Sequence, residues 1–268
     1  MAESEIHPTA LVAPGARLGA GVRAGPYCVI GPRVVVGDGC RLHSHVVIEG
    51  RTSLGAGNEI FPFAALGHVP QDLKHRGEET RLEIGTNNRI RESVTMNPGT
   101  AGGGGLTKVG SHGLFMVGAH VAHDCKVGDH VVFANNATLG GHCIIEDFVI
   151  LGGLSAVHQF VRIGAHAFLG GMSGLEHDLI PFGVAVGDRA SLQGLNIVGL
   201  KRRGFTREQI QTLRNAYRLL SAPEGTLMER LGEVETMFAG DAGVAKIVTF
   251  IRERSDRAIC VPRMGASP

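Results

Sequence analysis

Residues 121–174 read VAHDCK VGDHVV FANNAT LGGHCI IEDFVI LGGLSA VHQFVR IGAHAF LGGMSG when they are divided into hexapeptides. Each hexapeptide begins with a branched aliphatic residue or Phe, and Gly follows it in several of them. The same interval already starts at Ile6 and continues through Val12 and Leu18. A six-residue period is typical of a parallel β-helix, in which each hexapeptide forms one short strand and corner and three close a triangular coil. The chain is therefore predicted to be an all-β prism over most of its length.

The fifth position of the repeat indicates which side chains face inward. It holds small residues such as Ala16, Ala119 and Ser155, so we expect positions one and five to line the prism interior. Gly recurs at position two, where we expect a tight corner that needs its backbone freedom. Four cysteines occupy position five and are predicted to be small buried fillers instead of ligands or nucleophiles. They are Cys28, Cys40, Cys125 and Cys143.

The composition favours a soluble protein of the cytoplasm. The formal net charge is +1, and we find neither an apolar N-terminal run nor a stretch long enough to span a bilayer. We therefore expect no secretion and no membrane insertion. No dense basic block, aromatic ladder or zinc-finger spacing is present, so nucleic-acid binding is not expected.

The sequence changes character after about Pro181, and beyond Gly204 apolar residues recur with helical spacing. Three helices are expected there, each after a residue suited to cap its N-terminus. These caps are Thr206, Thr226 and Asp241. We therefore expect two domains, a β-helix at residues 1–190 and a small α-helical C-terminal domain at residues 191–268.

Two excursions interrupt the hexapeptides, and interruptions of a solenoid are where function is usually added. The first runs from about His68 to Arg81, and the second from Asn97 to Lys108. Charged residues of the first excursion could be ordinary solvated loop residues. The four glycines at 102–105 are expected to form a flexible hinge, because they do not open a helix as phosphate-binding loops do.

Histidines gather on one face of the predicted prism. With three hexapeptides per coil, the segments that begin at Val121, Leu139 and Val157 stack on one another. They carry His123, His142 and His158 at outward positions, about 4.8 Å apart from coil to coil. His120 stands at the corner just before them. A single histidine is more often structural, but three on one face indicate a site.

Two chemistries fit such a column. An imidazole can take a proton from a hydroxyl nucleophile near neutral pH while a neighbour stabilises an oxyanion. Several histidines can instead hold zinc, as they do in γ-class carbonic anhydrases, which share the hexapeptide prism. A purely structural trimeric prism and a coenzyme A-dependent acetyltransferase are further alternatives.

Six motifs, in order along almost the whole chain, resemble those of the UDP-N-acetylglucosamine O-acyltransferases of lipid A biosynthesis. They are His68–Lys74, Gly103–Gly110, Ala119–Asp124, Ala134–Leu139, Ala156–Phe160 and Asn196–Phe205. The resemblance implies a left-handed parallel β-helix, a homotrimer, acyl carrier protein as the acyl donor and UDP-N-acetylglucosamine as the acceptor. It implies no cofactor and no metal.

The resemblance also implies roles for individual residues. His123 corresponds to the general base that takes the proton from the sugar 3-hydroxyl, and Asp124 to its orienting partner. Other matching positions would bind substrate between subunits. They are Gln71, Asp72, Lys74, His120, His142, His158 and Gln159 around the sugar and phosphate, and Asn196 and Arg202 near the nucleotide. Many relatives have Glu where this chain has Val198. The sequence leaves open how this difference affects nucleotide binding.

Three further expectations concern assembly and the donor. Phe133 and the uncharged stretch at 134–136 are expected to lie outward against another subunit, and Asp72 and His123 of different subunits to share a site.

Gly171 corresponds to the residue that limits acyl-chain length, and without a side chain it predicts a longer 3-hydroxyacyl group. Basic residues of the helical domain are expected to steer the acidic carrier protein. They are Lys201, Arg202, Arg203, Arg207, Arg252 and Arg254. The sequence leaves open the exact acyl chain and whether the acceptor carries a 3-hydroxyl or a 3-amino group.

Overall fold

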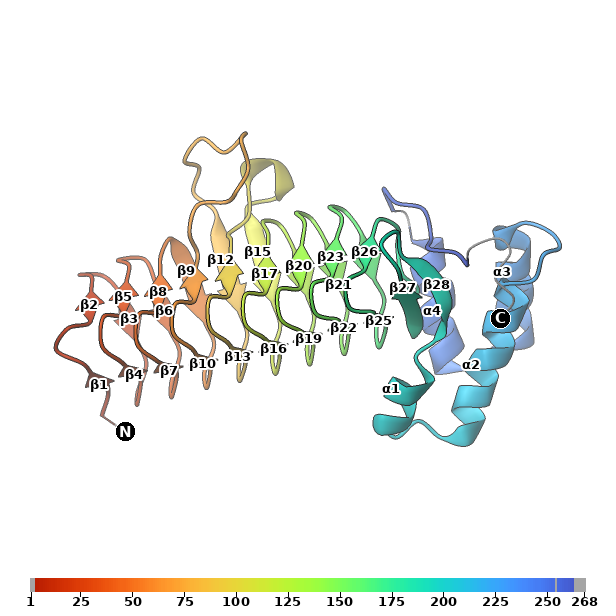
Figure 1. The fold of residues 1–268 in the computed structure, drawn as a ribbon, viewed down its shortest axis with the longest axis horizontal. Helices are drawn as coiled ribbons and strands as arrows, with labels where there is room; N and C mark the ends of the chain where they lie inside the picture. The colour runs from red at the N-terminus through yellow and green to blue at the C-terminus, as the bar shows by residue number, and fades with distance from the viewer. Residues whose placement is uncertain (1–2, 254, 263–268) are drawn as a thin grey trace.

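The structure is a computed structural model that describes residues 3–253 and 255–262. The chain winds into a long triangular prism of short strands, and helices follow at the C-terminal end (Figure 1). From β1 to β27 the strands pair in parallel from one coil to the next, so that His120 lies beside Thr138 and Thr138 beside Ala156. This register confirms the predicted β-helix with three hexapeptides per coil.

The strands form three sheets, which we call A, B and C. Sheet A contains β1 (Glu5–Ile6), β4 (Arg23–Ala24), β7 (Arg41–Leu42), β10 (Glu59–Ile60), β13 (Arg89–Ile90), β16 (Leu114–Phe115), β19 (Val132–Phe133), β22 (Ile150–Leu151), β25 (Phe168–Leu169), β27 (Gly183–Val186) and β28 (Ser191–Leu195). Sheet B contains β2 (Leu11–Val12), β5 (Val29–Ile30), β8 (Val47–Ile48), β11 (Ala65–Leu66), β14 (Thr95–Met96), β17 (His120–Val121), β20 (Thr138–Leu139), β23 (Ala156–Val157) and β26 (Gly174–Leu175). Sheet C contains β3 (Arg17–Leu18), β6 (Val35–Val36), β9 (Arg51–Leu54), β12 (Arg81–Ile84), β15 (Leu106–Val109), β18 (Lys126–Val127), β21 (Ile144–Ile145) and β24 (Arg162–Ile163).

The prism interior holds the residues of positions one and five, as the repeat predicts. All five cysteines are unpaired and buried, including Cys260 near the C-terminus. Phe133 belongs to this interior: its side chain is fully buried, and its ring packs 5.0 Å from that of Phe115. The expectation that Phe133 faces outward against another subunit is therefore wrong, because it occupies position one of its hexapeptide.

The glycines of position two serve a different purpose from the one expected. Left-handed backbone recurs at position four instead, where residues such as Tyr27, His45 and Asp124 have φ near +60°. Position two needs glycine because the next coil passes close to it. A Cβ on Gly37, for example, would lie 2.7 Å from the backbone nitrogen of Ala56. Close approach of the coils therefore selects these glycines.

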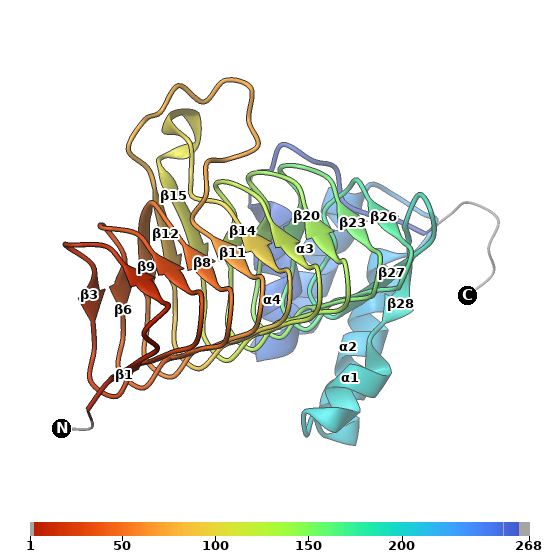
Figure 2. The same cartoon turned by 60° about the vertical axis from the view of Figure 1, so that its left-hand side comes forward.

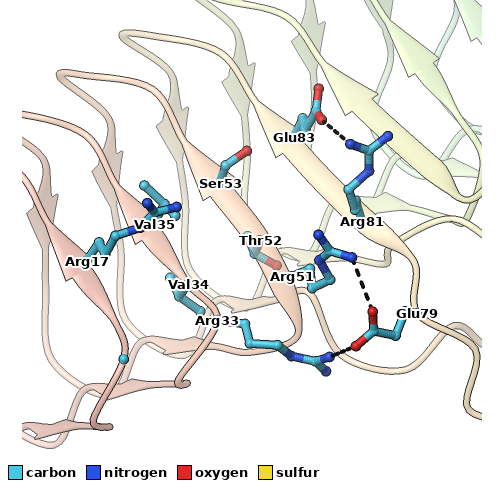
Figure 3. A pocket seen from close by; sticks show the side chains of 11 residues that line it. Arg17, Arg33, Val34, Val35, Arg51, Thr52, Ser53, Glu79, Arg81 and Glu83 are labelled. Atoms are coloured by element: carbon cyan, nitrogen blue, oxygen red, sulfur yellow. Dashed lines mark hydrogen bonds and ion pairs between the residues drawn. The ribbon is translucent and has the colours of Figure 1, made fainter.

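Both excursions leave the prism on the same side and lie next to each other (Figures 1 and 2). The first, residues 67–80, joins β11 to β12, and the second, residues 97–105, joins β14 to β15 and contains the short 3-10 helix η1 (Ala101–Gly103). Glu79 ends the first excursion and accepts hydrogen bonds from Arg33 at 2.6 Å and Arg51 at 3.2 Å (Figure 3). These ion pairs tie the excursion to earlier coils.

Helices α1 (Ile197–Arg202), α2 (Arg207–Leu220), α3 (Leu227–Met237) and α4 (Ala242–Arg252) follow the prism. Thr206 and Thr226 form the predicted capping boxes, and Asp241 caps α4. The sequence reading missed α1, a six-residue helix that Asn196 caps. Because β28 pairs with β27, the expected boundary between residues 190 and 191 falls in the turn of a hairpin that extends sheet A. Among the described residues, no helix combines the length and the hydrophobicity that a bilayer span requires.

A buried ion pair fastens the C-terminal region to the last coils. Arg162 donates to the Asp178 carboxylate at 2.7 Å and to the Phe250 carbonyl of α4 at 3.0 Å. The backbone of Asp178 in turn donates to the Ala258 carbonyl and accepts from the Cys260 amide, at 2.8 and 2.7 Å. The segment after α4 is thus held along the end of the prism.

Candidate active site

His123 and Asp124 form a hydrogen-bonded pair in the corner that follows β17. The His123 ring nitrogen Nδ1 lies 2.8 Å from Oδ2 of Asp124, whose side chain is only 1% exposed. A carboxylate accepts and does not donate, so Nδ1 carries the proton and Nε2 keeps its lone pair. The pair therefore presents His123 as a base at Nε2.

Thr100 of the second excursion completes the surroundings of Asp124. Its backbone N–H donates to Oδ1 at 2.8 Å, and its hydroxyl donates to Oδ2 at 2.6 Å. The Asp124 backbone N–H donates to the hydroxyl of Thr107 at 2.7 Å. The Asp124 carboxylate thus accepts from three donors, the Thr100 N–H, the Thr100 hydroxyl and His123 Nδ1. A buried charged group requires such partners.

The glycine run packs over this carboxylate. A Cβ on Gly103 would lie 2.0 Å from Cγ of Asp124, whereas a Cβ on Gly102 would meet nothing within 4 Å. The run was expected to be a flexible hinge, but Gly103 lies in η1 and in close contact with Asp124. Its lack of a side chain makes room for the carboxylate.

His142 and His120 differ from His123 in their partners. His142 stacks on Phe160 and meets the His123 ring edge-on, and its Nε2 is 3.8 Å from Asp124 Oδ2, beyond hydrogen-bond distance. Burial lowers the pKa of His142, and burial followed by the charge of His123 lowers the pKa of His120. Both rings therefore favour the neutral form near pH 7, and the Asp124 hydrogen bond distinguishes His123 from them.

The structure brings four of the nine expected substrate residues together with His123. A pocket of about 430 Å³ lies over sheet B, and Ala122 and Gly140 are among its small lining residues. The expected residues that line it are Gln71, His120, His123, His158 and Gln159. His123 and His158 of the predicted histidine column thus line one pocket, whereas His142 contacts the His123 ring edge-on and is not among the lining residues.

Asp72 and Lys74 lie in the first excursion, on the same side as this pocket. The Asp72 carboxylate accepts the Lys74 backbone N–H at 2.9 Å. That hydrogen bond lowers the pKa of Asp72, and the charges of His123, Lys74 and His142 act in the same direction. Asp72 is thus within electrostatic range of His123 in the same chain.

Gly141 explains how the His123 ring fits into the corner. A Cβ on Gly141 would lie 2.5 Å from Cε1 and 2.7 Å from Nε2 of His123. Any side chain at this position would therefore push the base out of place.

Asn196 and Arg202 are not part of the histidine pocket in a single chain. They line a separate cavity of about 530 Å³ over sheet A, together with Val198 and Arg203. The Asn196 side chain is already engaged, because it accepts from the Gly199 amide and donates to the His166 carbonyl at 3.0 Å each. Gly171 lies elsewhere again, exposed at the corner between β25 and β26, where a Cβ would be 3.2 Å from the Gly153 carbonyl oxygen.

Two further features of the chain resemble binding sites. His123, Asp124 and His142 offer ligand atoms within 4.8 Å of one another, which could suit a metal ion. A cavity of about 510 Å³ on sheet C is lined by Arg17, Arg33 and other residues of the ion-paired face in Figure 3. The carboxylates of that cavity, Glu79 and Glu83, are paired with arginines, and among the described residues no histidine lies beside its Thr52 and Ser53 hydroxyls. The chemistry therefore points to the histidine pocket.

Sequence reasoning missed several residues of the pocket. Asn97 is buried, its amide donates to the His68 carbonyl at 3.1 Å, and its Oδ1 has no hydrogen-bond partner. Thr100 and Asn97 both belong to the second excursion, so their position in an interruption of the repeat was the available signal. Arg257 contacts His158 but lies in the segment after α4, where no interruption of the repeat marks it.

A prism of hexapeptides with an imidazole and carboxylate pair in a surface pocket defines a hexapeptide-repeat transferase. A model described as bacterial transferase hexapeptide (six repeats) matches residues 15–50, and one described as UDP-N-acetylglucosamine O-acyltransferase, domain 2, matches residues 178–260. The chain belongs to the family of UDP-N-acetylglucosamine O-acyltransferases, and it is an enzyme of that class.

Relatives of known name cover almost all of the chain. It is 55% identical over 263 residues to the acyl-[acyl-carrier-protein]–UDP-N-acetylglucosamine O-acyltransferase of Bartonella bacilliformis, spanning 98% of this chain and 96% of the relative. The enzyme of the same name from Caulobacter vibrioides is 55% identical over 96% of this chain and 98% of its own length. The solved UDP-N-acetylglucosamine acyltransferase of Francisella novicida superposes with a TM-score of 0.92 at 33% identity, over 98% of each chain.

Proposed function

We propose that the histidine pocket catalyses transfer of a 3-hydroxyacyl chain from acyl carrier protein to the 3-hydroxyl of UDP-N-acetylglucosamine, the first step of lipid A biosynthesis. His123 Nε2 takes the proton of the 3-hydroxyl as its oxygen attacks the thioester carbonyl. The tetrahedral intermediate then breaks its C–S bond, and the imidazolium gives the proton to the departing thiolate of the carrier. The products are the acylated sugar nucleotide and the free thiol of the carrier, and the reaction requires no cofactor.

The observation that carries this proposal is the chain of hydrogen bonds from Thr100 through Asp124 to His123. It fixes the tautomer that leaves Nε2 basic and places a negative charge beside the imidazolium that forms. Thr100 occupies both Asp124 oxygens, so within the His123, Asp124 and His142 cluster only the two imidazoles are left to bind zinc, fewer than the three protein ligands of catalytic zinc sites. Activity that survives exhaustive chelation supports the base, and loss that zinc alone restores would support the metal.

The acyl donor is inferred from the helical region. Lys201, Arg202 and Arg207 are exposed and suit a small acidic carrier protein. Arg203 donates instead to the Phe148 carbonyl, Arg252 pairs with Glu235, and Arg254 lies outside the described residues. Coenzyme A-dependent acetyltransferases with this repeat typically lack such a region. Five unpaired cysteines agree with a reducing compartment, the cytoplasm.

We also propose that the active unit is a homotrimer with sites between subunits. In the second half of the prism, sheet A directs apolar side chains outward, an uncharged face suited to contact with another copy. They are Leu114, Val132, Ile150, Phe168 and Val184. The cavity with Asn196 and Arg202 lies over this same sheet, whereas His123 lies over sheet B.

Mixed trimers test this arrangement. Combining His123→Ala subunits with Arg202→Ala subunits should restore activity well above that of either variant, because some interfaces then carry both intact residues. Combining His123→Ala with Asp72→Ala should restore none, because one site takes both residues from the same subunit, and every subunit of the mixture lacks one of them. Steady-state rates of mixtures, with mixing verified by mass spectrometry, are the measurement. Equal behaviour of the two mixtures would contradict the proposed sharing of sites.

Gly171 is proposed to leave the acyl groove open for a long chain. Each additional buried CH₂ contributes about 0.8 kcal/mol, or roughly fourfold in preference. Gly171→Met should therefore shift the preferred donor to a shorter chain while turnover with that donor persists. A panel of acyl carrier proteins of graded chain length is the measurement. An unchanged preference in a folded variant would leave Gly171 as a corner residue only.

A further inference from the structure

The segment after α4 reaches the histidine pocket through one side chain. The Arg257 guanidinium lies 2.6 Å from Nδ1 of His158 through one terminal nitrogen, and its Nε donates to the Gln159 carbonyl at 3.1 Å. Arg257 is separated from these residues by almost 100 positions in the sequence. It contacts two residues of the pocket from outside it.

This contact decides which ring nitrogen of His158 carries the proton. A guanidinium has only donors, so at 2.6 Å the Nδ1 atom must accept. Nδ1 also lies 3.2 Å from the Gln159 carbonyl oxygen, to which it could donate only in the other tautomer. The shorter, charge-assisted bond excludes that alternative, because two donors cannot face each other at this distance. His158 therefore carries its proton on Nε2.

The position of Arg257 is built into the fold. The neighbouring Ala258 carbonyl and Cys260 amide bond to the backbone of Asp178, and Arg162 holds the Asp178 carboxylate. Asp178 and Cys260 are both almost fully buried. Glu176, the carboxylate one coil beyond His158, is paired with Arg189. The guanidinium is thus supplied to His158 by a segment that is fastened to the prism.

We propose that Arg257 is a positioning residue that fixes His158 as an Nε2–H donor toward the acceptor sugar nucleotide. This inference rests on the proposed function of the pocket. A donor of fixed direction suits a phosphate or carbonyl oxygen of the substrate, and it leaves His123 as the base. The C-terminal segment is then a part of the active site.

Nuclear magnetic resonance of ¹⁵N-histidine in the full-length protein tests the tautomer without reference to activity. The His158 ring, assigned by comparison with His158→Ala, should show a protonated Nε2 and an unprotonated Nδ1. In Arg257→Met the ring should shift toward Nδ1–H, because the Gln159 carbonyl then becomes its partner. An Nδ1–H ring in the unmodified protein, or a ring unaffected by Arg257→Met, would overturn the proposal.

Kinetics provide the second arm. Arg257→Met should lower kcat/KM for the sugar nucleotide about tenfold, the size of one hydrogen bond, mainly through KM. In a His158→Ala background the same substitution should have no further effect. Arg218→Met, a change of the same type at an exposed position of α2, is the matched control and should leave the ring and KM unchanged. Additive losses would refute the link to His158, whereas an inactive unmodified enzyme would refute the proposed function itself.

Discussion

His123→Ala is expected to lower kcat by about 10²- to 10⁴-fold, the contribution typical of a positioned general base. The ring contributes nothing to the prism interior, since position three faces the pocket. Asp124 keeps both hydrogen bonds from Thr100 in the variant, so its carboxylate remains partnered. The fold and its assembly should therefore survive the substitution.

Single-turnover rates with acyl carrier protein and UDP-N-acetylglucosamine measure this loss, and circular dichroism with sedimentation checks folding and assembly. His142→Ala is a useful comparison, because the His142 ring has no hydrogen bond to Asp124. This substitution should lower kcat less than His123→Ala does. Near-normal turnover of a well-folded His123→Ala enzyme would require another base.

Gly103→Ala should lower kcat about a hundredfold, although residue 103 is neither charged nor reactive. The added methyl would lie 2.0 to 2.3 Å from the three carboxyl atoms of Asp124, so either the carboxylate or η1 must move. Both movements break the hydrogen bonds that orient His123.

The adjacent glycine supplies the control for this prediction. Gly102→Ala places its methyl in open space within the same excursion, and activity should stay near that of the unmodified enzyme. A Gly103→Ala enzyme with the kcat of the unmodified enzyme would show that the carboxylate tolerates displacement. Equal losses would instead indicate that the excursion as a whole must remain free of side chains.

The sequence by itself determined the prism and much of the pocket. A period of six allows only one arrangement of inward and outward side chains, so the interior, the stacking of coils and the face with His123, His142 and His158 followed from counting. The caps at Thr206, Thr226 and Asp241 were readable because capping is local. Phe133 occupies position one of its hexapeptide, and the repeat therefore predicts a buried side chain, as the structure has it. The expectation that it faces another subunit ignored this position.

Only the tertiary structure decided which groups touch that face. The 3-10 turn that brings Thr100 and Gly103 to Asp124 lies in an interruption of the repeat, where the period gives no position. Asn196 was matched to a nucleotide contact, but packing uses its side chain to cap α1 and to bond the His166 carbonyl. Arg257 reaches His158 because a buried ion pair, Arg162 with Asp178, fastens the C-terminal segment beside the last coils. Such contacts join residues far apart in the chain, and local patterns carry no information about them.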